Sequence, residues 1–308
     1  MEHRLLKQGE CLMYDTIIIG AGAAGITAGI YAKRAGLNVI VLEKMLRGGQ
    51  IVNAPSIENY PGFITVTGAA FASAMYEQAQ AQGVQFAAEN AIKFDITAEK
   101  KRVITNKREL LSQSVIIAVG ASHKRLGCEG EDTFAGKGVS YCPVCDGTFF
   151  SQTDVCIVGG GNSALVGAEY LAKICKTVYL VHRREEFRAS KAAVDAVKSL
   201  ANVKLILGNT IERIQGENRV SRIVLSKETE KNKELEVNAV FVSVGQEPQT
   251  AAFKDILEMD ENGYIIAGED CKTDIPGVFA AGDCRTKPLR QLVTAAADGA
   301  VAALECVR

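Results

Sequence analysis

The sequence has little of what a metal site, a membrane span or a nucleic-acid surface requires. It contains three histidines and only one pair of cysteines two residues apart, Cys142 and Cys145, so a four-ligand zinc site around that pair would lack two ligands. The net charge of −1 gives no hint of a nucleic acid or an anionic membrane as partner. The uncharged run of residues 16–32 is shorter than the about 20 apolar residues of a spanning helix and is interrupted by glycines. We therefore expect no metal, no nucleic acid and no membrane partner.

The cysteines are too scattered for a secreted disulfide framework. Nine are present, an odd number, whereas such frameworks show an even and denser pattern in a shorter chain. Apart from Cys142 and Cys145, we interpret them as thiols in a reducing compartment and predict a cytoplasmic protein. Residues 1–12 carry several charges and no apolar segment of a signal peptide, and we expect them to form an N-terminal extension.

Two similar segments, residues 15–44 and 154–184, organise the chain. Each has a β-branched run, a glycine-rich turn, a helical stretch and a second β-rich run, which is the βαβ pattern of an α/β fold. Their turns, GxGxxG and GxGxxA, allow a tight bend and let backbone N–H groups at a helix N-terminus reach a pyrophosphate. We predict two Rossmann-like nucleotide-binding domains, whose turns bind through Gly20, Gly22, Ala23, Ala24 and Gly25 and through Gly159, Gly161, Asn162, Ser163 and Ala164.

The two repeats differ where the second strand ends. The first repeat has an acid there, which accepts hydrogen bonds from a free ribose 2′-OH and suits FAD or NAD. The second repeat has a basic cluster at the same spacing, and guanidinium groups bind a 2′-phosphate that a carboxylate would repel. We predict FAD in the first repeat and NADPH in the second, a solvated basic surface being the alternative. The predicted residues are Glu43 and Lys44 in the first repeat and His182, Arg183, Arg184 and Arg188 in the second.

The order of the remaining strand signals predicts one nucleotide domain inserted into another. Two strand-plus-glycine runs, residues 114–121 and 239–250, bracket the second repeat. We expect a discontinuous FAD-binding domain of residues 13–122 and 247–308, and an NADPH-binding domain of residues 123–246 that carries the cysteine pair. Near the C-terminus, Gly282-Asp283 follows a strand and places a carboxylate that suits a flavin's ribityl or phosphate groups. A plain turn is the alternative for Asp283.

At this point the sequence resembles the low-molecular-weight, bacterial-type thioredoxin reductases. The match runs from about residue 13 to the C-terminus, in order and at family spacing. The sequence departs from the family pattern at two places, and neither change affects a residue that takes part in the chemistry. Val119 replaces a usual threonine, and Pro143-Val144 fills the gap between the cysteines. The matching motifs are Gly20-x-Gly22-x-x-Gly25, Gly48-Gly49-Gln50, Glu58-Asn59-Tyr60-Pro61-Gly62, Ala118-Val119-Gly120, Cys142-Pro143-Val144-Cys145-Asp146, Gly159-x-Gly161-x-x-Ala164, His182-Arg183-Arg184-x-x-x-Arg188, Gly282-Asp283 and Arg290-Gln291.

The resemblance implies a homodimeric oxidoreductase with one FAD per subunit. Electrons would pass from NADPH to FAD, then to the dithiol, then to oxidised thioredoxin. It implies Cys145 next to the flavin, Cys142 attacking the partner disulfide and Asp146 handling protons. A related flavin disulfide reductase with another thioredoxin-like partner or a donor other than NADPH is the alternative. The further FAD-site residues that the motifs imply are Gly49, Gln50, Asn59, Gly282, Asp283, Arg290 and Gln291.

The residues themselves are compatible with this flow of electrons. A CxxC pair carries two electrons, since one thiol attacks and the other resolves the mixed disulfide. Asp146, directly after Cys145, is placed to exchange protons with a thiol, although Asp-Gly is also a strong turn signal. Because the pair lies in the inserted segment and must meet both a flavin and a bulky partner, we hypothesise that this domain rotates about residues 121–126 and 244–248.

Overall fold

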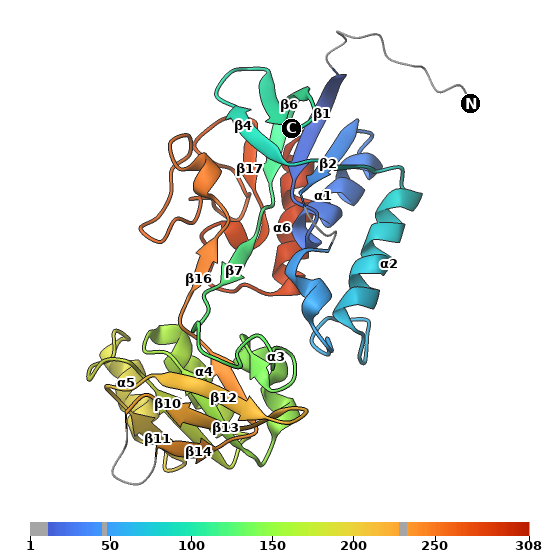
Figure 1. Cartoon of the computed structure of the whole chain (residues 1–308). Coiled ribbons are helices and arrows are strands. Elements are labelled where there is room, and N and C mark those ends of the chain that lie inside the picture. The colour runs from blue at the N-terminus through green and yellow to red at the C-terminus, as the bar shows by residue number, and fades with distance from the viewer. Residues whose placement is uncertain (1–11, 45–47, 228–232, 308) are drawn as a thin grey trace. The chain divides into compact units, whose positions relative to one another are not determined.

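The computed structural model describes residues 12–44, 48–227 and 233–307 (Figure 1). The predicted N-terminal extension therefore lies outside the described residues, except for residue 12. The fold is α/β with parallel sheets, as predicted. The chain divides into two compact units, Met1–Ser122 with Glu247–Arg308, and His123–Gln246. In the described part of the chain, no helix is both long and apolar enough to cross a membrane.

A seven-stranded sheet forms the centre of the first unit, in the order β3-β2-β1-β6-β5-β4 with β17 also paired to β6. The strands β3, β2, β1, β6 and β17 pair in parallel, whereas β4 and β5 are antiparallel. The strands are β1 (Leu12–Ile19), β2 (Val39–Glu43), β3 (Gln85–Ala88), β4 (Ala91–Asp95), β5 (Lys101–Thr105), β6 (Glu109–Ile117) and β17 (Val278–Ala280).

Side chains from both faces of this sheet are buried, as expected of central parallel strands. Ile18 of β1 packs in a cluster with residues of α1 and α6, whereas its neighbours Ile17 and Ile19 belong to a second cluster that includes Phe253. The β-branched run before the first glycine turn is therefore covered on both sides. The helices of this unit are α1 (Ala23–Arg34), α2 (Gly68–Ala81), α6 (Leu292–Glu305) and the short 3-10 turns η1 (Gly49–Asn53), η3 (Ala251–Phe253) and η4 (Gly282–Cys284).

Helices α1 and α6 lie side by side with their backbones in close approach (Figure 1). A Cβ added to Gly299 of α6 would lie 2.1 Å from the carbonyl oxygen of Ala24 in α1. Glycine is therefore required at this crossing, and the alanine-rich composition of residues 292–305 allows the same contact along the helix. This packing holds the start of α1 beside the turn that follows β17.

The second unit repeats the parallel βαβ arrangement on a smaller scale. Its main sheet has the order β11-β10-β9-β15-β8, and every pairing in it is parallel. A separate antiparallel sheet, β12-β13-β14, packs its apolar face into the same core. The elements are β8 (Val139–Ser140), α3 (Pro143–Asp146), η2 (Gly147–Phe150), β9 (Asp154–Val158), α4 (Asn162–Ala172), β10 (Thr177–Val181), α5 (Lys191–Lys198), β11 (Val203–Ile206), β12 (Ile211–Gly216), β13 (Val220–Leu225), β14 (Glu234–Glu236) and β15 (Ala239–Val242).

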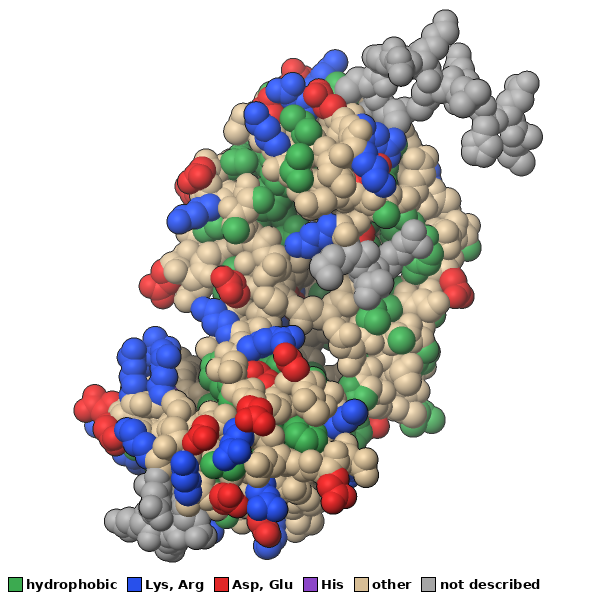
Figure 2. Space-filling model, viewed as in Figure 1, with side chains coloured by type: hydrophobic (Ala, Val, Ile, Leu, Met, Phe, Trp, Pro, Cys, Tyr) green, Lys and Arg blue, Asp and Glu red, His purple; other side chains and the backbone are tan. Residues whose placement is uncertain are grey.

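The chain passes between the two units twice, through β7 (Ala121–His123) and β16 (Gln246–Pro248), and these two short strands pair with each other. Lysine, arginine, aspartate and glutamate side chains are interspersed over the face shown in Figure 2. This pattern agrees with the nearly balanced charge of the sequence.

Candidate functional site

The first glycine turn joins β1 to α1 and shows which glycines the fold itself needs. Gly20 has φ +106°, and a Cβ there would lie 2.4 Å from the carbonyl oxygen of Ala118. A Cβ on Gly25 would lie 1.8 Å from the carbonyl oxygen of Gly20. Gly22, the N-cap of α1, would meet no atom of the described chain within 4 Å. The open space at Gly22, at a helix N-terminus, is where a phosphate can approach the backbone.

Glu43 ends β2 beside this turn. One of its carboxylate oxygens accepts a hydrogen bond of 2.8 Å from the backbone N–H of Ala21. The acid that the sequence places at the ribose position is therefore held against the glycine turn, with Lys44 exposed after it.

The segment after residue 47 lies against the same turn. The N–H of Gly48 donates to the carbonyl of Ala21 at 2.7 Å, and a Cβ on Gly49 would lie 3.3 Å from the Cα of Gly22. Gln50 donates to the carbonyl oxygen of Ala121. Gly49 and Gln50, far apart in sequence from the strand end near residue 120, are thus brought beside the first turn.

The turn after β17 completes this side of the first unit. A Cβ on Gly282 would lie 2.9 Å from the Cβ of Ala24, which places Gly282-Asp283 beside the start of α1. The Oδ1 atom of Asp283 is buried and has no hydrogen-bond partner among the described residues. Burial raises the pKa of Asp283, against the opposing charges of Lys287 and Arg290. A buried carboxylate oxygen without a donor is a site for a hydroxyl or N–H of a ligand.

Two further predicted residues border this turn. The guanidinium of Arg290 lies over the ring of Tyr264, 3.8 Å from its centroid, and donates to the backbone carbonyls of Arg285 and Asp283. Gln291, the N-cap of α6, accepts a 3.2 Å hydrogen bond from the side-chain amide of Asn59. Asn59, Arg290 and Gln291 are therefore assembled around the N-terminus of α6.

A buried ionic cluster, which was not predicted from the sequence, lies next to the turn after β17. Asp298 of α6 accepts two hydrogen bonds from Arg285, at 2.8 and 2.9 Å, one from Lys287 at 2.8 Å and one from the N–H of Gly282 at 2.9 Å. Arg285 is 2% exposed. The signal that could have found the cluster is that Asp298 is the one charged residue among positions 292–304 of an otherwise small and apolar helix.

The first unit therefore has groups that suit a dinucleotide. The space at Gly22, the fixed carboxylate of Glu43 and the unpartnered oxygen of Asp283 lie along one side of the β1–α1 turn and the adjoining β17 turn. Neighbouring Ala23 and Ala24 present no side chain large enough to block the helix N-terminus.

The second glycine turn joins β9 to α4. As in the first turn, one glycine is required by close packing and another faces open space. A Cβ on Gly159 would lie 2.3 Å from the carbonyl oxygen of Ser243, whereas one on Gly161 would meet no atom of the described chain within 4 Å. Ala164 packs in the core between α4 and the sheet. Asn162 accepts a 2.9 Å hydrogen bond from the N–H of Ser190, so that its side chain joins the turn to the start of α5 while Ser163 is exposed beside it.

The basic cluster is divided into one buried ring and three exposed arginines. His182 is 5% exposed, stacks on Phe187 and packs so tightly on Gly160 that a Cβ there would lie 2.1 Å from the ring. Burial lowers the pKa of His182, and its Nε2 has no hydrogen-bond partner in the described structure. By contrast, Arg183, Arg184 and Arg188 are exposed. The N–H of Arg188 donates to the carbonyl of Gly160 at 2.8 Å, which keeps the arginine loop against the glycine turn.

The cysteine pair forms a disulfide at the start of a one-turn helix in the same unit. Cys142 is the N-cap of α3, and its Sγ accepts a 3.2 Å hydrogen bond from the N–H of Cys145. Both cysteines are partly buried, and Val144 between them is 52% exposed. Pro143 lies against Gly167 of α4, where a Cβ would meet its ring at 2.9 Å. The disulfide is therefore held on a packed element, with one side accessible.

Asp146 lies at the end of this helix. Its Oδ2 accepts a hydrogen bond of 2.6 Å from the hydroxyl of Ser140. Burial raises the pKa of Asp146, and the hydrogen bond from Ser140 opposes this rise. A carboxyl with these surroundings is suited to proton exchange nearer neutral pH than an exposed aspartate is. Ser140 was not among the predicted residues, because a serine two positions before a cysteine carries no signal of its own.

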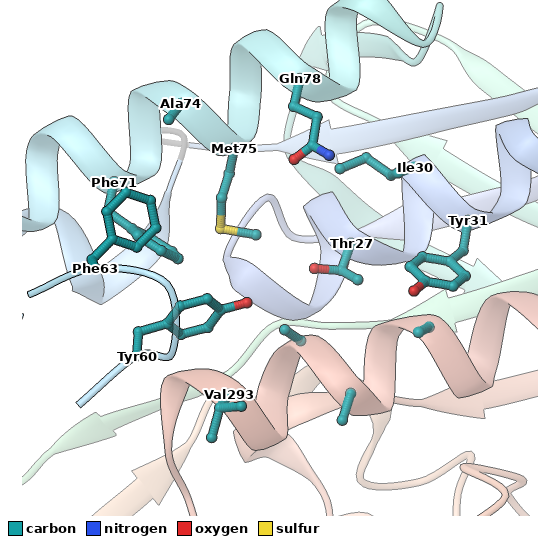
Figure 3. A pocket seen from close by; sticks show the side chains of 13 residues that line it. Thr27, Ile30, Tyr31, Tyr60, Phe63, Phe71, Ala74, Met75, Gln78 and Val293 are labelled. Atoms are coloured by element: carbon teal, nitrogen blue, oxygen red, sulfur yellow. The ribbon is translucent and has the colours of Figure 1, made fainter.

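A separate apolar groove of about 470 Å³ lies on the first unit, between α1, α2 and α6. Figure 3 shows Met75 of α2 pointing toward α1, with Tyr60 and Phe63 closing one end and Tyr31 near the other. Tyr31, Phe63 and Val293 are between 41% and 44% exposed. Among its lining residues only Tyr60 belongs to a motif noted in the sequence, since the lining comes from four separate segments.

Comparison with known proteins gives consistent results over nearly the whole chain. Residues 14–300 match the family model described as pyridine nucleotide-disulphide oxidoreductase. The thioredoxin reductase of Listeria innocua is 40% identical over 292 residues, which cover 94% of this chain and 92% of that protein. The thioredoxin reductase of Mycoplasma pneumoniae is 40% identical over 296 residues, covering 95% and 94%. The crystal structure of thioredoxin reductase from Streptococcus pyogenes has a TM-score of 0.91 at 39% identity and covers 97% of this chain and 98% of that one.

Proposed function

We propose that this chain, which belongs to the pyridine nucleotide-disulphide oxidoreductase family and within it to the thioredoxin reductases, passes two electrons from NADPH through FAD to Cys142 and Cys145 and on to the disulfide of a thioredoxin. The observation that carries the proposal is the Cys142–Cys145 disulfide in a chain that also has two dinucleotide turns. A disulfide that closes a loop of only four residues contributes little to folding. A carrier of two electrons, by contrast, needs two cysteines close enough to form a disulfide.

The cofactors are proposed from the two turns. Support for FAD in the first unit comes from Glu43, held by the Ala21 N–H, and from the unpartnered Oδ1 of Asp283. When bound, a flavin accepts a hydride from a nicotinamide and supplies the two electrons that open the disulfide. Support for NADPH over NADH comes from Arg183, Arg184 and Arg188, which are exposed and have no ion pair among the described residues. These arginines also disfavour the alternative of a donor other than NADPH.

The dithiol then reduces the partner in two exchanges. Cys142 loses its proton to solvent, and its thiolate attacks one sulfur of the partner disulfide; the other partner sulfur leaves and takes a proton from the carboxyl of Asp146. Cys145 passes its thiol proton to the Asp146 carboxylate, and its thiolate attacks the Sγ of Cys142. This step re-forms the Cys142–Cys145 disulfide and releases the second partner thiolate, which is protonated from solvent.

Exposed apolar side chains next to the disulfide offer a docking surface for the partner. Val144 lies between the two cysteines, and Phe149 of η2, 46% exposed, follows one turn later. Val144 belongs to α3, and Phe149 belongs to η2, which directly follows it. This surface supports a protein substrate, since a small disulfide would not need it.

Three further features of the working enzyme are proposed. The groove between α1, α2 and α6 would be covered by a second copy in a homodimer, because its lining is mostly apolar and Tyr31, Phe63 and Val293 in it are exposed. The second unit would rotate about the segments 121–126 and 244–248, and an inter-unit crosslink that left turnover unimpaired would contradict this. A cytoplasmic location is supported by the free thiols of six described cysteines.

The function is tested with the purified holoprotein. We expect a yellow flavoprotein that oxidises NADPH in preference to NADH, and only when thioredoxin disulfide is present. Cys142→Ser and Cys145→Ser should each abolish thioredoxin reduction while FAD stays bound, because neither side chain belongs to the first unit. Wild-type activity in both variants would refute the assignment, and turnover with a thioredoxin-like protein but not with thioredoxin would favour the alternative partner.

A further inference from the structure

Ser140 connects the two chemical parts of the disulfide site. Its hydroxyl oxygen accepts a 3.1 Å hydrogen bond from the N–H of Cys142. Its hydroxyl hydrogen goes to the Oδ2 of Asp146, at 2.6 Å. A serine hydroxyl has one hydrogen to donate, so these two bonds define its orientation. Ser140 thus joins the backbone of the first cysteine to the carboxylate that follows the second.

Ser140 belongs to a strand of the sheet, whereas both of its partners belong to a short helix or its N-cap. The residue is 6% exposed and belongs to β8, whose parallel pairing sets it opposite the fully buried Phe241 of β15. Asp146 lies at the end of a four-residue helix, and Cys142 at its start. Ser140 therefore connects the edge strand of this sheet to both ends of the helix.

We infer that Ser140 is a positioning residue for disulfide exchange: it reserves the Oδ2 of Asp146 as a hydrogen-bond acceptor and leaves Oδ1 as the oxygen that carries the exchanged proton. The inference rests on the proposed function, in which Asp146 gives a proton to the leaving partner thiolate and recovers one from Cys145. Without the hydroxyl, the carboxyl is free to turn, and either oxygen takes the proton.

The surroundings of Asp146 offer no other ionic partner among the described residues. Of the shifts in its pKa, burial is the largest cause and the Ser140 hydrogen bond the other. Helix α4 packs on α3 and η2 through Gly167, Tyr170 and Leu171, which are uncharged. Glu169, the charged residue of α4, pairs at 3.2 Å with Lys173, the C-cap of that helix. Removal of the Ser140 hydroxyl should therefore change the pKa of Asp146 directly.

The test is a pH profile of one exchange, followed in the holoenzyme after reduction with one equivalent of NADPH. Mixing with thioredoxin disulfide, quenching by alkylation, separation of the two proteins and counting of the alkylated thiols on thioredoxin give the rate at each pH. Asp146→Asn should abolish one limb of the wild-type profile, that is, the part in which the exchange rate changes as Asp146 titrates. In Ser140→Ala that limb should move to higher pH by about one unit, because the hydrogen bond to the charged form is lost.

Matched variants separate positioning from packing. Ser140→Thr keeps the hydroxyl and should restore the wild-type limb, whereas Ser140→Val has the same shape without a donor and should behave as Ser140→Ala does. Ser112→Ala is the control: Ser112 is a fully buried strand serine of the other unit that donates to the carbonyl of Ser114 at 2.8 Å. It should leave the profile unchanged. The Thr and Val pair keeps the test decisive even where the alanine variant does not fold.

Three results would overturn the inference, and they can be told apart. An unmoved limb in Ser140→Ala and Ser140→Val, with Asp146→Asn still abolishing it, would show that Ser140 only packs the strand while the proposed function stands. Asp146→Asn with the wild-type profile would remove the proton role of Asp146 itself, and the inference with it. A shift by Ser140→Ala that persisted in the Asp146→Asn background would also contradict the inference, since the effect would not pass through this carboxylate.

Discussion

Asp298 shows how a single residue supports a site that it does not line. Its buried carboxylate is bound by Arg285, Lys287 and the N–H of Gly282, and so fastens the segment with Asp283 to α6. Burial alone would raise the pKa of Asp298, but the hydrogen bonds from Arg285 and Lys287 hold it below its usual range. The residue thus remains charged wherever the protein is folded near neutral pH.

Replacement of this carboxylate should destabilise the protein strongly. Asp298→Ala leaves two buried cations without their counter-charge, and we expect the free energy of unfolding to fall by about 3–5 kcal/mol in urea titrations. Glu234→Gln, which breaks an exposed pair with Arg222, is the control and should cost no more than about 1 kcal/mol. Equal effects of the two variants would contradict the prediction.

The same residue predicts the direction of acid sensitivity. Because the pKa of Asp298 is lower in the folded than in the unfolded protein, its contribution is present above the usual carboxyl range and is lost as the pH falls through the folded pKa. Unfolding midpoints measured against pH should therefore fall on the acid side in the wild type. Asp298→Ala should show a shallower fall, and an identical slope would count against this linkage.

The exposed arginines of the second unit should determine the choice between nicotinamide cofactors. Arg183→Ala and Arg184→Ala should each raise the KM for NADPH about tenfold or more, because each removes a charge-assisted contact to a 2′-phosphate, and leave the KM for NADH nearly unchanged. Steady-state kinetics with both donors give the ratio. Lys191→Ala, which removes another cation near the start of α5, is the control. A parallel loss with NADH would show that the arginines act on something other than the phosphate.

At the scale of elements, two glycines next to the helix α1 differ in what surrounds them. Gly299 of α6 is needed for packing, since a Cβ would lie 2.1 Å from the Ala24 carbonyl. Gly22 at the N-terminus of α1 faces open space in the described chain. The first is a requirement of the protein alone, whereas we predict that the second serves a ligand that approaches the backbone.

Alanine at the two positions should separate these purposes. Gly299→Ala should lower the stability of the apoprotein by about 1–3 kcal/mol, because the helices must move apart. Gly22→Ala should cost less than about 1 kcal/mol in the apoprotein but weaken FAD binding, which titration of apoprotein with FAD by fluorescence quenching would measure. Unchanged FAD affinity in Gly22→Ala would place the pyrophosphate elsewhere.

At the scale of the whole molecule, the apolar groove predicts self-association. Val293→Glu and Tyr31→Glu place a charge on exposed lining residues, and sedimentation velocity should show a shift from dimer to monomer, since a buried unpaired charge opposes assembly. Ile92→Glu, at an exposed apolar position outside the groove, should remain dimeric. Dimers that persist in both groove variants would show that the second copy binds another surface.

Much of the fold was predictable because it depends on local patterns. The β-branched runs and glycine turns near residues 20 and 159 predicted two βαβ units, and the α/β class is confirmed. The roles of the site residues remain predictions, but their placement shows what pattern could not foresee. Asp298 lies 15 residues after Asp283, and it contacts that segment by accepting a hydrogen bond from the N–H of Gly282. Ser140 reaches Asp146 only because β8 ends beside α3.

By itself, the sequence determined which chemistry is available: a redox pair with an acid beside it, an acid after one nucleotide turn and arginines after the other. These depend on residue identity and spacing along one element, which short-range geometry fixes. Only the tertiary structure decided that His182 is buried while its neighbouring arginines are exposed, that Asp283 keeps an unpartnered oxygen and that Ser140 bonds Asp146. Burial and hydrogen-bond partners come from segments distant in the chain, and no pattern along the sequence carries them.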